Sequence, residues 1–191
     1  MSQSKVTFVA ICYGEQYEVY MFIGMLLCQK NPNWETLIYH DGPNPWLKAV
    51  VESFKDPRIQ YREEEANSGS WGCFNRIRAI NSISTDFIVQ CTLQEYYVPV
   101  AVDHILKAGE LNDFIYWPTI HHSADYNIIP GEPRVKHIDW SNFAMKTWIA
   151  KKVGIKQPTD YCADGLFVED VMGSGYIKSL IRIPKVLSVK N

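Results

Sequence analysis

Short apolar runs alternate with amphipathic stretches along the first half of the chain. The runs are rich in β-branched and aromatic residues, which is typical of strands covered on both faces. They occupy Val6–Cys12, Trp34–Tyr39, Ile59–Arg62 and Asp86–Cys91. Between them, apolar residues recur at helical spacing, which predicts helices over residues 19–27, 45–54 and 73–83. Strands that alternate with helices form mostly parallel sheets, and these bind ligands at the carboxyl ends of their strands.

The second half of the chain has a less regular pattern. It predicts a helix over residues 98–107, a strand over 113–117, an irregular hairpin over 126–138, helices over 140–152 and 160–172, and a closing strand over 181–189. No internal repeat, low-complexity segment or linker divides the sequence. We therefore predict one α/β domain over residues 1–191, with a mostly parallel sheet, flanking helices and an irregular second half.

Composition excludes several classes of protein. Hydrophobic residues make up 47% and charged residues 21% of the 191 residues, as in globular domains. The net charge of −2 and the lack of a basic stripe argue against a nucleic-acid partner. No apolar window has the length of a membrane span. The five cysteines are far apart and lack a CxxC pair, which favours reduced thiols and a cytoplasmic protein.

Four segments resemble family-2-type glycosyltransferases of the GT-A fold, and the resemblance covers nearly the whole chain. They are Ile11–Glu15, Tyr39–Pro43, Asp86–Pro99 and Ala163–Gly165 with Glu169. The resemblance implies a single GT-A-like domain, with a nucleotide-sugar-binding half over residues 1–99 and an acceptor and catalytic half over 100–191. It also implies transfer of a sugar from a nucleotide-diphosphate donor, a UDP-sugar first of all, to a hydroxyl of a glycan, lipid or protein.

The chemistry of the expected donor side fits this activity. Tyr13 can cover the face of a base or pack on the first helix, and Asp41 can accept from a base imide or ribose hydroxyl or only form a turn. Glycines in the loop from Asn67 to Gly72 allow a nucleotide to approach the backbone. Arg76 can offset diphosphate charge. The donor-binding residues that we predict are Cys12, Tyr13, Asp41, Gly69, Trp71, Asn75, Arg76, Thr92, Gln94, Glu95 and Lys190.

The sequence departs from the family at its metal site. Where the family has a DxD motif, this chain has Thr92-Leu93-Gln94-Glu95, so Glu95 is the one candidate metal ligand in that motif. Where relatives end on Val-His-Asn, this chain has Lys190, which can neutralise the diphosphate or lie free in solvent. We expect no required cofactor, or Mn²⁺ or Mg²⁺ held weakly through the donor diphosphate.

On the acceptor side, the resemblance implies that Asp164 is the catalytic base of an inverting transfer, with Glu169 as the alternative base. Asp139 and Trp140 are expected on the acceptor side, where Trp140 can stack on a sugar or belong to the core. His121 and His122 lack metal-ligand spacing.

Three other hypotheses remain open at this stage. The chain could be a catalytically inactive nucleotide-sugar-binding module of the same fold. It could be another nucleotide-using enzyme such as a nucleotidyltransferase, although a P-loop and a GxGxxG motif are missing. It could also be a nucleic-acid-modifying glycosyltransferase, against which the acidic balance argues.

Overall fold

A central seven-stranded sheet organises the protein. The computed structural model describes residues 4–14 and 16–191, so Glu15 of the first expected motif lies outside the described residues. The strand order is β10-β6-β9-β4-β1-β2-β3. The bounds are β1 Val6–Cys12, β2 Trp34–His40, β3 Ile59–Glu63, β4 Phe87–Cys91, β6 Phe114–Tyr116, β9 Phe143–Lys146 and β10 Leu180–Arg182. Only β9 runs antiparallel to its neighbours among these strands, which confirms the mostly parallel α/β sheet.

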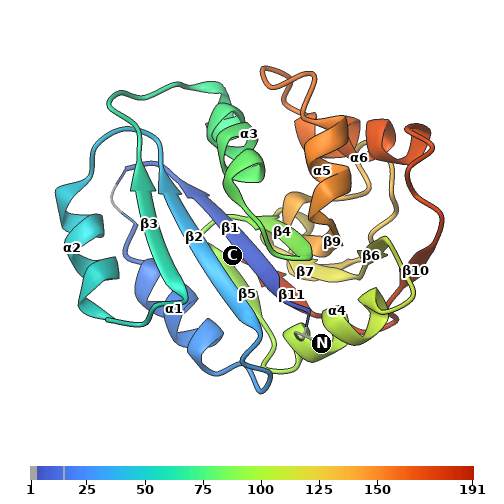
Figure 1. Ribbon diagram of the computed structural model, residues 1–191, viewed down its shortest axis with the longest axis horizontal. Coiled ribbons are helices and arrows are strands. Elements are labelled where there is room, and N and C mark those ends of the chain that lie inside the picture. The colour runs from blue at the N-terminus through green and yellow to red at the C-terminus, as the bar shows by residue number, and fades with distance from the viewer. Residues whose placement is uncertain (1–3, 15) are drawn as a thin grey trace.

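Both faces of this sheet are buried, because alternate side chains of a strand point to opposite faces. In β1, Phe8 and Ala10 belong to one apolar cluster, whereas Val9 and Ile11 belong to the other. Helices α1 Val19–Leu27, α2 Pro45–Ser53 and α4 Ala101–Gly109 cover the first face. Helices α3 Cys73–Ser82, α5 Thr147–Val153 and α6 Ala163–Gly173 cover the second face (Figure 1).

Local sequence signals fix several helix ends. The Asn44 side chain accepts a hydrogen bond from the Leu47 amide at 2.9 Å, and Pro45 is the first residue of α2. An Asn cap followed by proline is a strong helix start, because proline has no amide hydrogen that would need a partner there. This start was predicted from the sequence and is confirmed.

A second, smaller sheet includes the last strand of the chain. Its order is β5-β11-β7-β8, and its bounds are β5 Glu95–Tyr97, β7 Thr119–His121, β8 Asn127–Ile129 and β11 Ser188–Lys190. Strand β11 pairs antiparallel with β5 and parallel with β7. The last residues of the chain therefore lie beside the segment that follows β4, about ninety residues earlier in the sequence.

Two predicted elements of the second half were wrong. The helix expected over 140–152 is instead the 3₁₀ turn η3 Trp140–Asn142, strand β9 and the short helix α5. Strand β9 fills the slot between β4 and β6, so sheet pairing overrides the local helical pattern. The closing strand expected over 181–189 is two strands in different sheets, separated at Pro184, which cannot donate to a strand ladder.

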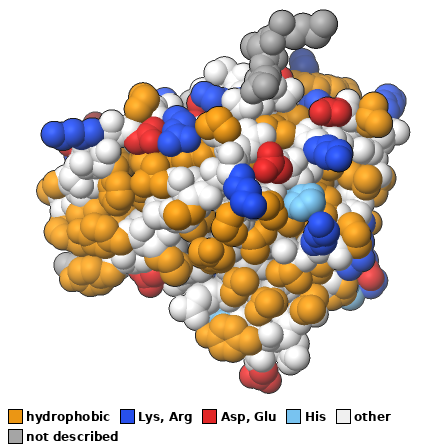
Figure 2. Space-filling model, turned by 90° about the horizontal axis from the view of Figure 1, so that it is seen from below, with side chains coloured by type: hydrophobic (Ala, Val, Ile, Leu, Met, Phe, Trp, Pro, Cys, Tyr) orange, Lys and Arg blue, Asp and Glu red, His pale blue; other side chains and the backbone are white. Residues whose placement is uncertain are grey.

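Hydrophobic side chains are widespread on the face seen from below (Figure 2). Exposed aromatic rings of α1 and α2 contact one another: the ring centroids of Tyr20 and Trp46 are 6.4 Å apart. No helix within residues 4–14 and 16–191 is long and apolar enough to span a membrane.

The packing of α4 on the central sheet predicts an asymmetric effect of two glycine substitutions. Gly109 ends α4, and a methyl group there would meet the Phe87 ring of β4 at less than van der Waals distance. We expect Gly109→Ala to lower the free energy of unfolding in urea by about 1–3 kcal/mol. Gly173 ends α6 with open space around it. Gly173→Ala should therefore leave the free energy of unfolding unchanged or raise it slightly. Equal effects of the two substitutions would contradict the packing of α4 on β4.

Candidate functional site

A cavity of about 430 Å³ lies at the carboxyl ends of β1, β2 and β4. This is where parallel sheets bind ligands, and the volume suits a small molecule. Its lining includes seven of the predicted donor-binding residues: Cys12, Tyr13, Asp41, Gly69, Trp71, Arg76 and Thr92.

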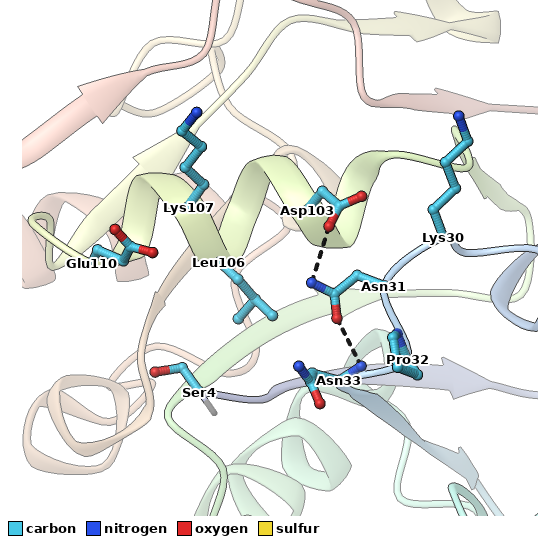
Figure 3. Close-up of a pocket in the computed structure, with 9 residues that line it drawn as sticks. All are labelled: Ser4, Lys30, Asn31, Pro32, Asn33, Asp103, Leu106, Lys107 and Glu110. Carbon is cyan, nitrogen blue, oxygen red and sulfur yellow. Dashed lines mark hydrogen bonds between the residues drawn. The ribbon is translucent and has the colours of Figure 1, made fainter. Parts of the chain in front are cut away.

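A larger groove of about 800 Å³ lies at the opposite, amino ends of the strands, between the start of the chain and α4 (Figure 3). In this groove Asn31 donates a hydrogen bond of 3.0 Å to Asp103 of α4. The smaller cavity is the better candidate site, because it lies at the strand ends where parallel sheets bind ligands.

Asp41 is the best-supported side chain of the cavity. It is 3% exposed, and its Oδ1 accepts hydrogen bonds from the Ser68 amide at 2.9 Å, the Ser68 hydroxyl at 2.7 Å and the Asn75 amide group at 3.2 Å. All hydrogen bonds that described residues donate to this carboxylate end on Oδ1. The other oxygen, Oδ2, accepts no hydrogen bond from the described residues. Asn75 does not line the cavity, but its side chain donates a hydrogen bond to Asp41.

The turn that follows Ser68 has a strained backbone. Four consecutive residues, Gly69 to Gly72, have positive φ angles of 69°, 54°, 50° and 72°. Two of them, Ser70 and Trp71, are not glycine, and residues with a side chain pay roughly 1–2 kcal/mol for this conformation. Gly72 packs on Ile11 so closely that no side chain fits. This turn carries Trp71, which lines the cavity.

Exposed rings flank the cavity. Tyr13 is 66% exposed and stacks over the His40 ring, with centroids 6.4 Å apart. Trp71 is 67% exposed and makes an edge-to-face contact with Tyr161, at 5.8 Å between centroids. Large rings held in solvent beside a cavity are suited to cover the flat face of a base or a sugar.

Arg76 is a buried cation that forms no ion pair with the acidic residues that the structure describes. It is 2% exposed, and one guanidinium NH₂ group donates to Oε1 of Gln90 at 3.0 Å. The Trp140 ring lies on the guanidinium, with 4.8 Å from Cζ to the centroid. Within the described part of the chain, no carboxylate lies within 4.0 Å of Arg76, and its Nε has no hydrogen-bond partner. A buried charge without a counter-ion is costly, which points to an anionic ligand in the cavity.

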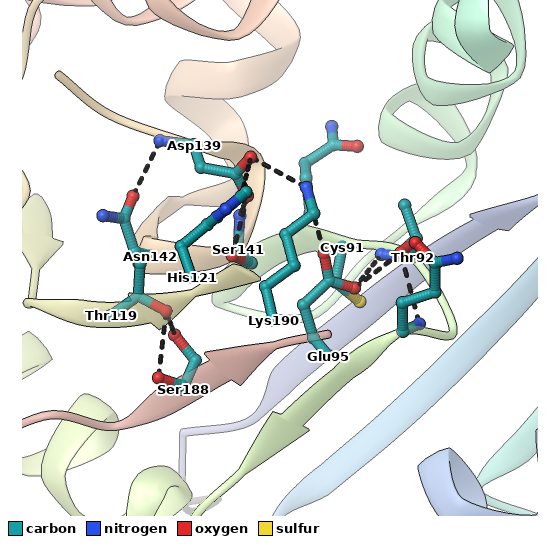
Figure 4. A network of polar contacts seen from close by, with 12 residues as sticks. Cys91, Thr92, Glu95, Thr119, His121, Asp139, Ser141, Asn142, Ser188 and Lys190 are labelled. Carbon is teal, nitrogen blue, oxygen red and sulfur yellow. Dashed lines mark hydrogen bonds and ion pairs between the residues drawn. The ribbon is translucent and has the colours of Figure 1, made fainter. Parts of the chain in front are cut away.

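Beside the cavity, Thr92 and Glu95 form a closed turn (Figure 4). Oε2 of Glu95 accepts from the Thr92 amide at 2.6 Å and the Thr92 hydroxyl at 2.8 Å. Lys190 Nζ lies 3.5 Å from Oε1 of Glu95 and 2.8 Å from Oδ2 of Asp139. Glu95 and Lys190 therefore do not line the cavity, and neither does Gln94. The ammonium is held by two carboxylates rather than directed at the donor side.

These residues do not fit a divalent metal ion. One Glu95 oxygen is occupied by Thr92, an ammonium lies against the other, and Thr92 and Gln94 are neutral. Across residues 4–14 and 16–191, no cluster of three His, Cys, Asp or Glu side chains could hold a metal ion.

Asp164 lies in the first turn of α6, where the charges of Asp139, Lys190 and Arg76 influence its ionisation. Burial raises its pKa to about 6. A hydrogen bond from the Gly165 amide opposes the rise, the charge of Asp139 adds to it, and the cations Lys190 and Arg76 reduce it. A carboxylate with this pKa can accept a proton near neutral pH.

The other predicted acceptor-side residues have structural surroundings. Glu169 is exposed, accepts a hydrogen bond from the Val135 amide at 2.9 Å and lines a different depression, so the structure does not bring it to the cavity. Trp140 packs on Phe167 at 5.7 Å and on Arg76. Asp139 caps η3 through Ser141 and pairs with Lys190.

Sequence reasoning missed two supporting residues. Gln90 holds Arg76, and its only signal was a polar residue inside the apolar run Phe87–Cys91. Ser68 donates a hydrogen bond to Asp41, although 27 residues separate the two in the sequence. That pairing has no local signature.

Comparison with known proteins gives a likeness of fold. No protein-family model and no curated protein matches the sequence. Among solved structures, this chain has the fold of GT-A glycosyltransferases over nearly its whole length. It is similar to S. aureus TarS 1-349, with a TM-score of 0.79 and 12% identity over 98% of this chain and 60% of that one.

Two further structures hold ligands. TarS 1-349 in complex with UDP-GlcNAc has a TM-score of 0.78 and 12% identity, over 97% of this chain and 58% of that one. The mannosyltransferase PcManGT from Pyrobaculum calidifontis, in complex with GDP-Man and Mn²⁺, has a TM-score of 0.74 and 13% identity, over 99% of this chain and 57% of that one. The chain thus spans less than two thirds of these proteins, and identities this low establish the fold alone.

The raised pKa of Asp164 predicts that Asp164→Asn stabilises the protein at high pH. A carboxyl whose pKa is raised from 3.8 to about 6 in the folded state contributes stability that is present below pH 4 and lost as the pH rises to 6. Urea unfolding of Asp164→Asn and wild type should therefore agree near pH 4. Between pH 4 and 7, the free energy of unfolding of the variant should come to exceed that of wild type by up to about 3 kcal/mol. The free energy of unfolding of Asp170→Asn should not exceed that of wild type at pH 8, since Asp170 pairs with Lys156 at 2.9 Å.

Proposed function

We propose that the protein transfers a sugar from a nucleoside diphosphate sugar to a hydroxyl group. The observation that carries the proposal is Arg76, a buried guanidinium that lines the same cavity as Asp41 and has no carboxylate partner among residues 4–14 and 16–191. A nucleoside diphosphate has complementary features, because its diphosphate is anionic and its base and ribose donate hydrogen bonds. A UDP-sugar is the first donor to test, since the similar structure of TarS contains UDP-GlcNAc.

In this proposal, each wall of the cavity recognises one part of the donor. The Tyr13 ring covers the base, and the free Oδ2 of Asp41 accepts from the base imide or a ribose hydroxyl. The strained turn at Gly69 offers close backbone approach, with Trp71 as a second ring. Arg76 neutralises the diphosphate.

The transfer that we propose is inverting, with Asp164 as the base. The acceptor oxygen forms a bond to the anomeric carbon while the bond from that carbon to the diphosphate oxygen breaks. The hydroxyl proton goes to the Asp164 carboxylate, and Arg76 stabilises the negative charge that builds on the leaving diphosphate. Glycan, lipid and protein hydroxyls are the acceptor classes to test.

The experiment that tests the proposal is a thermal-unfolding screen of the protein against nucleoside diphosphates and their sugars, each with EDTA and with Mn²⁺. A ligand that binds the native state raises the midpoint with its concentration. A rise with UDP or a UDP-sugar supports the donor site. If such donors bind and no acceptor yields transfer, the inactive nucleotide-sugar-binding module is the better assignment.

Asp164→Asn should separate binding from chemistry. The side chain keeps its size but can no longer accept a proton, so turnover should fall by about two orders of magnitude or more. Donor affinity, measured by calorimetry, should stay within about threefold of wild type, since Asp164 does not line the cavity. Asp170→Asn on the same helix is the matched control and should turn over normally. Retained turnover in Asp164→Asn would disprove the assignment of the base.

The activity of the wild type should follow the same ionisation. The base must be unprotonated, so kcat/KM should rise with pH up to about 6 and then level off.

A further inference from the structure

A row of three ionisable side chains crosses the second sheet. In the register of this sheet, Lys190 of β11 lies opposite Glu95 of β5 on one side and opposite His121 of β7 on the other. Directly opposed residues on paired strands share a face. In this sheet Lys190 thus lies between Glu95 and His121 (Figure 4).

Asp139 adds a second carboxylate to this row. Its Oδ2 lies 2.8 Å from Lys190 Nζ and 3.8 Å from Nε2 of His121, while its Oδ1 accepts from the Ser141 amide and hydroxyl. Because the Ser123 amide donates to Nδ1 of His121 at 3.1 Å, the proton of a neutral His121 ring is on Nε2, toward Asp139.

A fully buried carboxylate, Glu95, and a partly buried one, Asp139, share one cation. Glu95 is fully buried, and its Oε1 accepts no hydrogen bond from the described residues; Lys190 is the cation 3.5 Å away. Burial lowers the pKa of Lys190, but Asp139 and Glu95 outweigh this and raise the pKa above its ordinary value. Removal of one partner from such a group leaves an uncompensated buried charge.

The position of this ammonium relates it to the donor cavity. Thr92, whose amide and hydroxyl hold Glu95, lines the cavity, and Lys190 and Arg76 are close enough for each to influence the ionisation of Asp164. Without Lys190, two negative charges would lie beside the place where the diphosphate is expected. Their repulsion would act against Arg76.

We propose that Lys190 is a tethered cation which takes the place of a divalent metal ion beside the donor cavity. Its ammonium neutralises Glu95 and Asp139, so that Arg76 remains available to an anionic ligand. Lys190 is then a positioning residue and does not touch the donor. The proposal rests on the proposed donor site only for its relation to the diphosphate, and the test below uses no donor.

The test compares cations as substitutes for the missing side chain. Wild-type protein without nucleotide should bind no Mn²⁺ by electron paramagnetic resonance and show no Mn²⁺-dependent change in its unfolding midpoint. Lys190→Ala should unfold several degrees lower, and MnCl₂ or propylammonium chloride should restore at least half of the loss. KCl at equal ionic strength should not restore it. Lys190→Arg should need no added cation.

Two controls keep the test decisive. Lys178→Ala removes an exposed lysine whose Nζ contacts only the Gly175 carbonyl among the described residues, and it should respond to neither cation. Lys190→Ala/Glu95→Gln removes one negative charge as well, so it should fold more stably than Lys190→Ala and lose the response to Mn²⁺.

The proposal is overturned if wild type binds one Mn²⁺ without nucleotide, or if neither cation stabilises Lys190→Ala. A double variant that keeps the Mn²⁺ response would also overturn it. Failure of the proposed donor site would appear separately, as a lack of nucleotide binding, and would leave these cation responses unchanged.

Discussion

The requirement that a buried charge be neutralised explains how this site is arranged. Glu95, Asp139 and Lys190 satisfy that requirement among themselves. Arg76 does not: Gln90 and Trp140 hold its guanidinium, yet neither carries a negative charge. A buried cation that lines a cavity and that no described carboxylate neutralises carries a free-energy cost, which an anionic ligand would remove. Donor binding as proposed depends on this difference between Lys190, which is paired with carboxylates, and Arg76, which is not paired with any described carboxylate.

The parallel register of the central sheet brings the parts of the cavity together. Strands β1, β2 and β4 end at the same edge, so Tyr13, Asp41 and Thr92 meet although about eighty residues separate the first from the last. The second sheet then adds the end of the chain to the same region through β11. The first sheet forms the cavity, and the second sheet places Glu95 and Lys190 beside it.

Much of the first half could be predicted, because its strands are buried on both faces and its helix starts carry local signals such as Asn44. The second half could not, since β9 is a strand only because β4 and β6 leave a slot for it. The same distinction holds for the site. Asp41 follows a strand and was predicted, whereas the contact of Asp139 with Lys190 joins positions 51 residues apart that have no common pattern.

The most direct measurement is the affinity of wild type and Arg76→Gln for UDP and for uridine, by calorimetry in EDTA. If Arg76 is the unneutralised cation of a donor site, wild type binds UDP more tightly than uridine without any metal. The substitution should then cost at least tenfold in UDP affinity, about 1.4 kcal/mol, and leave uridine unchanged. Equal affinity of wild type for UDP and uridine, or UDP binding only when Mn²⁺ replaces EDTA, would contradict the account.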